Sequence, residues 1–168
     1  ARQTGLVQVT ITGRMAASIK LEDALKQRFG LLDAVVVPSS SEIERQRAVI
    51  AAAAGNYLAQ QLRDGMSVGV GWGQTLRHCL RYVPHRNYKG LSVVSLIGGL
   101  THSSAVNPHE TASHLADIVG GQCYYFAGPA FTDTEATREI LMNQPMLRDV
   151  YERGRKVDLA FVSVGELG

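Results

Sequence analysis

The sequence predicts an α/β fold with a mostly parallel β-sheet and helices on both faces. Three observations lead to this prediction. Short apolar runs of strand length alternate with longer segments of helical period. Side chains typical of helix starts stand before several of those segments. Glycine or proline separates many neighbouring segments, as expected where strands and helices are joined. Strands separated by helices imply right-handed βαβ units and therefore a parallel sheet.

The expected strands are short runs rich in apolar and β-branched residues, which is typical of strands buried on both faces. The first run is stopped by Pro38, and the second and third lead into glycines. In chain order the five expected strands cover residues 33–37, 67–70, 91–97, 122–126 and 159–164.

The expected helices follow from their start signals and from apolar residues at helical spacing. The signals include capping boxes, an N-cap asparagine and prolines at the first helical position. The capping boxes are Ser41 with Glu44 and Thr132 with Glu135. The N-cap is Asn107, and the prolines are Pro108 and Pro145. In chain order the expected helices cover residues 41–63, 74–82, 107–119, 132–143 and 145–156.

The two ends of the chain do not fit this alternation. Residues 1–20 lack the pattern, apart from an isolated strand-like run over 5–12. The chain ends directly after its last expected strand, where a helix would follow in a βαβ unit. We therefore expect residues 1–20 to be a linker or the remnant of a preceding module. Residues 21–168 are expected to form a partial domain, truncated at its C-terminus.

Composition excludes several classes of protein. The 168 residues are enough for one domain with a sizeable core. The net charge of +2 does not indicate a dominant nucleic-acid surface. Cys79 and Cys123 lie far apart without metal or CxxC spacing, as expected of reduced thiols in the cytoplasm. The apolar runs are too short to span a bilayer, and no signal peptide opens the sequence, so no membrane contact is expected.

A glycine-rich turn over residues 69–75 (GVGWGQT) follows the second expected strand. Open α/β sheets bind ligands beyond the carboxyl ends of their strands, and glycine amides before a helix can face an anion. A dinucleotide fingerprint starting at Gly69 would need glycine where Gln74 stands, and there is no GxxxxGK[ST] motif. A smaller phosphorylated ligand fits better than NAD or ATP. The simpler alternative is a tight turn that uses glycine for its torsion angles.

A second glycine-rich loop, residues 98–104 (GGLTHSS), follows the third expected strand. Its amides and the hydroxyls of Thr101 and Ser103 are suited to a phosphate or to sugar hydroxyls. Polar loops of this kind are also common surface connections. Trp72 and Phe131 either stack on a sugar ring or belong to the core. Two such loops after successive strands together favour a binding edge.

Metal and catalytic constellations are not found in the sequence. His109 and His114 are five residues apart, so on a helix they point roughly 140° away from each other, which argues against a zinc motif. Glu110 has an alternative role as the capping-box partner of Asn107. No GxSxG elbow, reactive CxxC or close carboxylate pair is present. We expect no catalytic residue, metal or cofactor.

These motifs resemble one family in order and spacing. The turn over 69–75, the loop from Gly98, Asn107 with Glu110, and residues 128–131, 141–150 and 159–168 carry the resemblance. They are similar to the sugar-binding domain of SorC/DeoR-type bacterial transcriptional regulators, over about residues 21–168. The resemblance implies a three-layer fold of Rossmann type, like that of phosphosugar isomerases and deaminases. It also implies a sensor in which a bound sugar phosphate changes oligomeric packing and operator affinity.

Carried over residue by residue, the resemblance implies a ligand site made of Gly71, Gln74, Thr75, Gly98, Gly99, Thr101, Asn107, Glu110 and Glu166. It implies a homo-oligomer, a dimer or tetramer, that reads operator DNA through a helix-turn-helix absent from this chain. A C-terminal portion that completes the family's pocket is also absent.

Two alternatives to the sensor stay open. One is an enzyme of the same fold, an aldose–ketose isomerase or amino-sugar-phosphate deaminase. Such an enzyme requires a base near the reacting carbon, for which Glu110, Glu166 and His102 are the candidates. The other is an oligomerisation module without a ligand.

Overall fold

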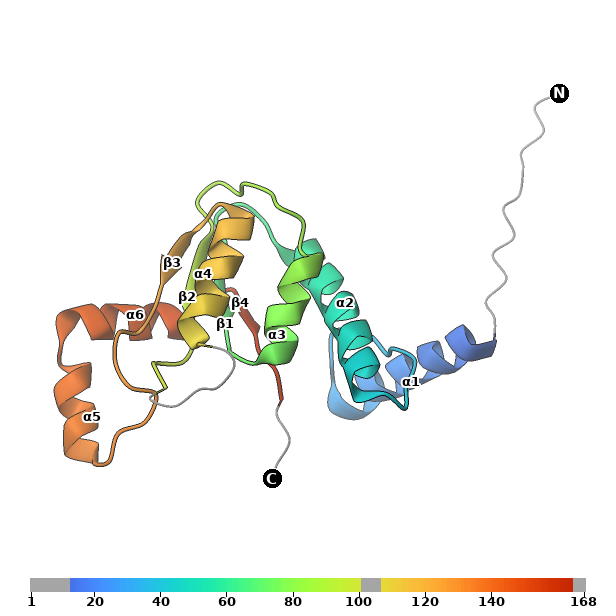
Figure 1. The fold of residues 1–168 in the computed structure, drawn as a ribbon, viewed down its shortest axis with the longest axis horizontal. Coiled ribbons are helices and arrows are strands. Elements are labelled where there is room, and N and C mark those ends of the chain that lie inside the picture. The colour runs from blue at the N-terminus through green and yellow to red at the C-terminus, as the bar shows by residue number, and fades with distance from the viewer. Residues whose placement is uncertain (1–12, 101–106, 165–168) are drawn as a thin grey trace. The chain divides into compact units, whose positions relative to one another are not determined.

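The computed structural model describes residues 13–100 and 107–164. The chain divides into two compact units, residues 1–49 and 50–168, and each is described by itself. The first unit holds helix α1 (Gly13–Phe29) and the start of helix α2 (Ile43–Gln61). The second unit holds the rest of α2 and the sheet (Figure 1). No helix among the described residues is long and apolar enough to cross a membrane.

Four parallel strands form the sheet of the second unit (Figure 1). They are β1 (Ser67–Val70), β2 (Ser92–Ser95), β3 (Gln122–Tyr124) and β4 (Leu159–Phe161). Their order is β3-β2-β1-β4, so β1 pairs with both β2 and β4. Parallel neighbours require crossover connections, which the helices provide. The predicted fold class is confirmed.

One face of the sheet packs against α2 and α4 (Pro108–Val119) to form the hydrophobic core. Val68 of β1 and Val93 of β2 point to this face and are fully buried. Leu58 of α2 and Leu115 of α4 pack against them in the same cluster. Burying one such side chain contributes about 1.5–3 kcal/mol, so this layer holds both helices against the strands.

Helix α6 (Pro145–Arg155) covers the opposite face. Val94 follows Val93 in β2 and therefore points away from the core. It lines a cavity together with Asp149 and Arg153 of α6. Helices thus lie on both faces of the sheet, as predicted.

Helix α4 begins and ends where the sequence predicts. Oδ1 of Asn107 accepts a hydrogen bond from the backbone N–H of His109 at 3.2 Å, and Pro108 occupies the first turn. Gly120 ends the helix with a φ of 63°, a left-handed conformation that favours glycine.

The other predicted helices are confirmed with small differences at their ends. The helix predicted over 74–82 is α3 (Gln74–Cys79) continued by a 3₁₀ turn, η1 (Leu80–Tyr82). The helix predicted from Thr132 starts later, as α5 (Glu135–Met142). Its N-cap is Thr134, whose Oγ1 accepts from the N–H of Thr137 at 3.1 Å. The Thr132 capping box is wrong, because the Thr132 hydroxyl donates to the Thr134 carbonyl instead.

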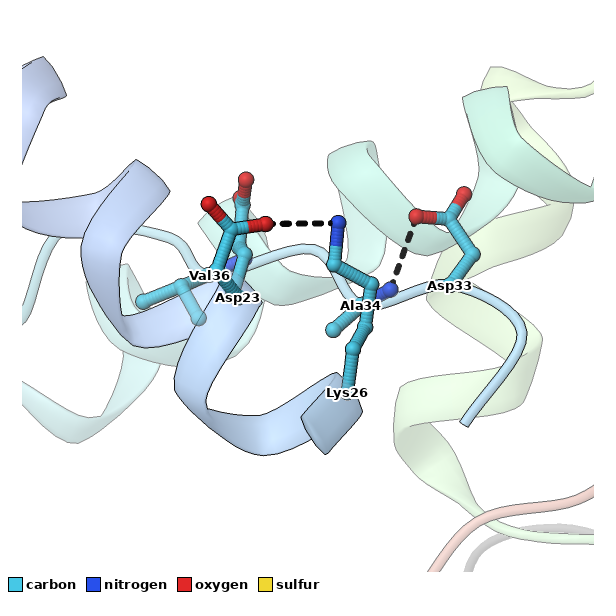
Figure 2. A network of polar contacts seen from close by, with 6 residues as sticks. Asp23, Lys26, Asp33, Ala34 and Val36 are labelled. Atoms are coloured by element: carbon cyan, nitrogen blue, oxygen red, sulfur yellow. Dashed lines mark hydrogen bonds and ion pairs between the residues drawn. The ribbon is translucent and has the colours of Figure 1, made fainter. Parts of the chain in front are cut away.

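The first predicted strand, residues 33–37, is wrong: these residues pair with no strand in the described part of the chain. The N–H of Val36 donates to Oε1 of Glu22 in α1 at 2.8 Å. The N–H of Ala34 donates to Oδ1 of Asp33 at 2.8 Å (Figure 2). Carboxylates therefore accept hydrogen bonds that a neighbouring strand would otherwise accept.

Helix α1 was not predicted, because its apolar residues do not form a single stripe along the helix. Within it, Asp23 and Lys26 form an ion pair at 2.8 Å (Figure 2), three residues apart and therefore on one helix face. The helix runs across residue 20, and the predicted boundary at that position stays a prediction. The strand predicted over 5–12 lies outside the described residues.

Candidate functional site

The carboxyl ends of the four parallel strands lie at one edge of the sheet. Residues 69 and 70 of the turn predicted over 69–75 belong to β1, and 71–75 follow it. The loop from Gly98 follows β2, and the turn over 128–131 follows β3. Ligands of open α/β sheets bind at this edge. The fold therefore brings to one edge segments that are far apart in the sequence.

Two hydrogen bonds tie the turn after β1 to the end of β4. The N–H of Gly71 donates to the carbonyl of Phe161 at 2.9 Å, and Oγ of Ser163 donates to the carbonyl of Trp72 at 3.0 Å. Gly73 has a φ of 133°, which a residue with a side chain rarely adopts. The Gly71 amide is thus engaged by the protein itself, and at Gly73 glycine serves the turn geometry.

Gln74 and Thr75 form the first turn of α3, directly after these glycines. The N-cap is Gly73, so no side chain caps the first N–H groups of the helix. Gln74 is exposed and Thr75 is half-buried. Both polar side chains therefore lie at the carboxyl edge of the sheet.

Two backbone hydrogen bonds join the loop after β2 to the turn after β3. The N–H of Gly99 donates to the carbonyl of Gly128, and the N–H of Ala130 donates to the carbonyl of Gly99, both at 2.8 Å. A Cβ added at Gly98 would lie 2.5 Å from the Gly128 oxygen, whereas one at Gly99 would lie 3.7 Å from it. Close backbone approach requires glycine at 98, and position 99 has room for a side chain.

Asn107 and Glu110 lie in the N-terminal region of α4, and both are exposed. The Asn107 oxygen is engaged by the His109 amide, and among the described residues no hydrogen-bond acceptor of its side-chain NH₂ group is found. The His109 ring packs against the ring of Tyr125, with centroids 4.3 Å apart at 50°. Tyr125 directly follows β3. The sequence reasoning missed this aromatic pair, because the predicted strand includes Tyr125 and nothing local links that residue to His109.

Three candidate residues lie outside the described part of the chain, so the structure does not place them. They are Thr101 and Glu166 of the implied ligand site, and His102, a candidate base; the Ser103 hydroxyl, suggested for a phosphate, lies outside it too.

A groove that the sequence did not predict lies between this edge and helices α5 and α6. Two cavities of about 200 and 220 Å³ share Leu96, Ile97, Gly98, Phe126 and Tyr151 and form one groove. We call it the α5–α6 groove. Among the predicted ligand residues that the structure describes, Gly98 lines it. The groove walls come from four separate segments, which local sequence patterns do not link.

The cysteine thiols do not form a nucleophilic centre. Cys79 is buried, and desolvation raises the pKa of its thiol from 9.0 to about 11. Desolvation, and to a smaller extent the negative charge of Asp117, also raises the pKa of Cys123. Across residues 13–100 and 107–164, no group of three or more His, Cys, Asp or Glu side chains is placed to hold a metal.

Residues 13–168 match a family model described as "Putative sugar-binding domain". The erythritol catabolism regulatory protein EryD of Brucella abortus is 32% identical to the chain over 163 residues. That match covers 96% of the chain and 52% of EryD. The deoxyribonucleoside regulator of Bacillus subtilis is 27% identical over 171 residues, covering 98% of the chain and 53% of the regulator. The chain thus spans about half the length of these relatives.

The crystal structure of full-length SorC, the sorbitol operon regulator of Klebsiella pneumoniae, has the same fold. It superposes with a TM-score of 0.80 at 24% identity, over 95% of this chain and 53% of SorC. The family match covers all of the described residues, including the carboxyl edge of the sheet. The chain therefore belongs to the sugar-binding domain family of SorC/DeoR-type transcriptional regulators.

Proposed function

We propose that this chain is the effector-sensing domain of a bacterial transcriptional regulator and that it binds a phosphorylated sugar or a free sugar. One observation carries the proposal. In a domain of the sugar-binding family, the turn over 71–75, the Gly98–Gly99 loop and the start of α4 meet the carboxyl edge of one parallel sheet. The names of EryD and the deoxyribonucleoside regulator refer to polyhydroxylated compounds, which supports a ligand of this class.

The proposed ligand residues divide into two groups by their available atoms. Gln74, Thr75 and the Asn107 amide provide side-chain hydrogen-bond donors, and Glu110 provides an exposed carboxylate for sugar hydroxyls. Of the proposed glycines 71, 98 and 99, only 99 is exposed, and 98 is required by its close approach to Gly128. Their part in amide donation is limited, because the amides of 71 and 99 already donate to carbonyls. Thr101 and Glu166 complete the proposed set.

The domain is proposed to sense its ligand and not to convert it. Ligand binding would change the packing of a homo-oligomer, a dimer or tetramer. That change would alter the affinity of a helix-turn-helix, elsewhere in the longer protein, for operator DNA. The proposed location is the cytoplasm, where the operator is. Calorimetry against four- to six-carbon sugar phosphates, the matching free sugars and inorganic phosphate tests ligand binding directly.

Gln74→Ala is the diagnostic variant, and Gln60→Ala, which changes an exposed glutamine of α2, is its matched control. Loss of a hydrogen bond to a charged group weakens binding by about tenfold or more, so Gln74→Ala should show that loss. Gln60→Ala should leave affinity unchanged. If neither the chain nor the longer regulator binds any compound of the panel, the proposal is refuted. Enzymatic conversion of any sugar phosphate would establish the isomerase or deaminase alternative.

Gly99→Asp separates a sensor from a pure assembly module. Position 99 is exposed and has space for a Cβ, so the substitution brings a carboxylate to the proposed site without a backbone clash. A sensor loses its response to ligand and still assembles, as measured by sedimentation. An assembly module shows no response with either residue at position 99.

A further inference from the structure

We propose that the α5–α6 groove is a second binding site, for a small organic anion with an apolar or aromatic body. The groove lies on the α6 side of the sheet and shares Gly98 alone with the described part of the proposed sugar site. The proposal therefore does not depend on sugar binding.

The walls of the groove are apolar. Leu96 and Phe126 line both cavities, and Leu141 and Met142 of α5 close one side. Neither α5 nor α6 contains a fully buried residue, although α6 covers the sheet. The helices therefore leave space above the strands. Known small-molecule sites measure roughly 300–1,000 Å³, so two adjoining cavities of about 200 and 220 Å³ together suit a ligand of two or three rings.

The charged side chains that line the groove are all basic. Arg138 of α5 lines one cavity and Arg155 of α6 lines the other. No Asp or Glu is among the described residues that line either cavity. Within the described part of the chain, the Arg138 guanidinium forms no ion pair, whereas Arg153 pairs with Asp149. An unpaired guanidinium beside an apolar wall matches a ligand that combines a ring with a carboxylate or sulfonate.

The test uses 8-anilino-1-naphthalenesulfonate, which carries two aromatic systems and one sulfonate. Its neutral analogue N-phenyl-1-naphthylamine carries the same rings without the charge. Fluorescence titration should show one sulfonate probe bound per chain. Arg138→Gln should weaken that probe by about tenfold, the usual effect of losing one charge-assisted hydrogen bond. The neutral analogue should bind the wild type and the variant equally.

Arg148→Gln is the matched control, because Arg148 is an exposed arginine of α6 that lines neither cavity. It should leave the affinity within about twofold, since the probe makes no hydrogen bond to it. Equal weakening by both variants would show attraction to net positive charge and would overturn the proposal. Equal binding of the neutral analogue and the sulfonate would also overturn it, because the guanidinium would then contribute nothing.

Methyl NMR on methionine-labelled chain locates the probe without any substitution. Met142 lines the groove, whereas Met146 lies on α6, 83% exposed, and lines neither cavity. The probe should shift the Met142 methyl signal and leave Met146 unchanged. A shift at Met146 alone, or dissociation of an oligomer on probe binding, would overturn the proposal. The second result would identify another copy of the chain as the occupant.

Discussion

The carbonyl oxygen of Gly128 lies 2.5 Å from the position that a Cβ of residue 98 would take. The two loops at the sheet edge therefore meet through their backbones. Glycine-rich loops are often attributed to ligand binding alone, but here one glycine is required by packing and its neighbour is not. The difference between adjacent positions allows the two roles to be separated by experiment.

Gly98→Ala should destabilise the domain by about 1–3 kcal/mol, because the new methyl group overlaps backbone atoms that cannot move independently. Gly99→Ala should change the free energy of unfolding by less than about 0.5 kcal/mol, as exposed substitutions usually do. Urea unfolding followed by circular dichroism measures both. Equal destabilisation by the two variants would contradict the close approach of the two loops at position 98.

Asn107→Ala should lower the free energy of unfolding by about 1 kcal/mol, because it removes the N-cap acceptor of α4. Asn107→Ser should leave the free energy of unfolding close to that of the wild type, since serine is an equally good N-cap. Serine lacks the amide donor proposed for the ligand, so Asn107→Ser should keep the stability and lose affinity. Normal affinity in that variant would remove Asn107 from the ligand site.

Gly154→Ala should stabilise the domain by up to about 0.5 kcal/mol, because alanine loses less backbone entropy than glycine in a helix, here in the last turn of α6. The added methyl group would lie 3.7 Å from Leu96 and 3.8 Å from Val94, which are ordinary contacts. Gly69→Ala differs, since its Cβ would lie 2.7 Å from a terminal methyl of Leu96 and would require that side chain to move. A lower melting temperature for Gly154→Ala would show that α6 packs more tightly than described.

The Cys79 thiol should resist alkylation in the folded protein until the pH approaches 11, because burial raises its pKa from 9.0 to about 11. Since the protonated thiol is favoured in the folded state, its contribution to stability is complete below pH 9. That contribution is lost as the pH rises through the folded pKa. Iodoacetamide labelling of Cys123→Ser, which leaves Cys79 as the only thiol, measures the reactivity. Rapid labelling near pH ~8, where a free thiol is already partly ionised, would contradict the described burial if no unfolding accompanies it.

The features predicted correctly from the sequence depend on local signals. Asn107, Pro108 and Gly120 mark the ends of α4 within a single stretch of chain, and the structure keeps all three signals. Strand β1 has the predicted bounds, because its apolar run is flanked by turn residues. The last strand extends only to Phe161, three residues short of the prediction, although Val162 and Val164 have strand-forming side chains.

Apart from the Thr132 capping box, where the hydroxyl bonds to nearby Thr134, the errors concern features that depend on packing or on distant residues. The run at 33–37 has the composition of a strand, but strand formation requires a neighbour, and its amides at 34 and 36 donate to carboxylates. The α5–α6 groove and the contact between His109 and Tyr125 likewise depend on packing between separate segments. For the ligand site, the sequence predicted the carboxyl edge of the sheet, where the structure places the glycine-rich turns. It could not show that the Gly71 and Gly99 amides are already engaged.

The hydrogen bond from Ser163 to Trp72 joins residues that are 91 positions apart. Contacts of such sequence separation form late, because a long loop must close first. The turn after β1 therefore acquires its native shape only when β4 has docked beside β1. A chain that ends before β4 lacks the hydrogen bonds from Phe161 and Ser163 that hold this turn, so we expect it not to bind the proposed ligand.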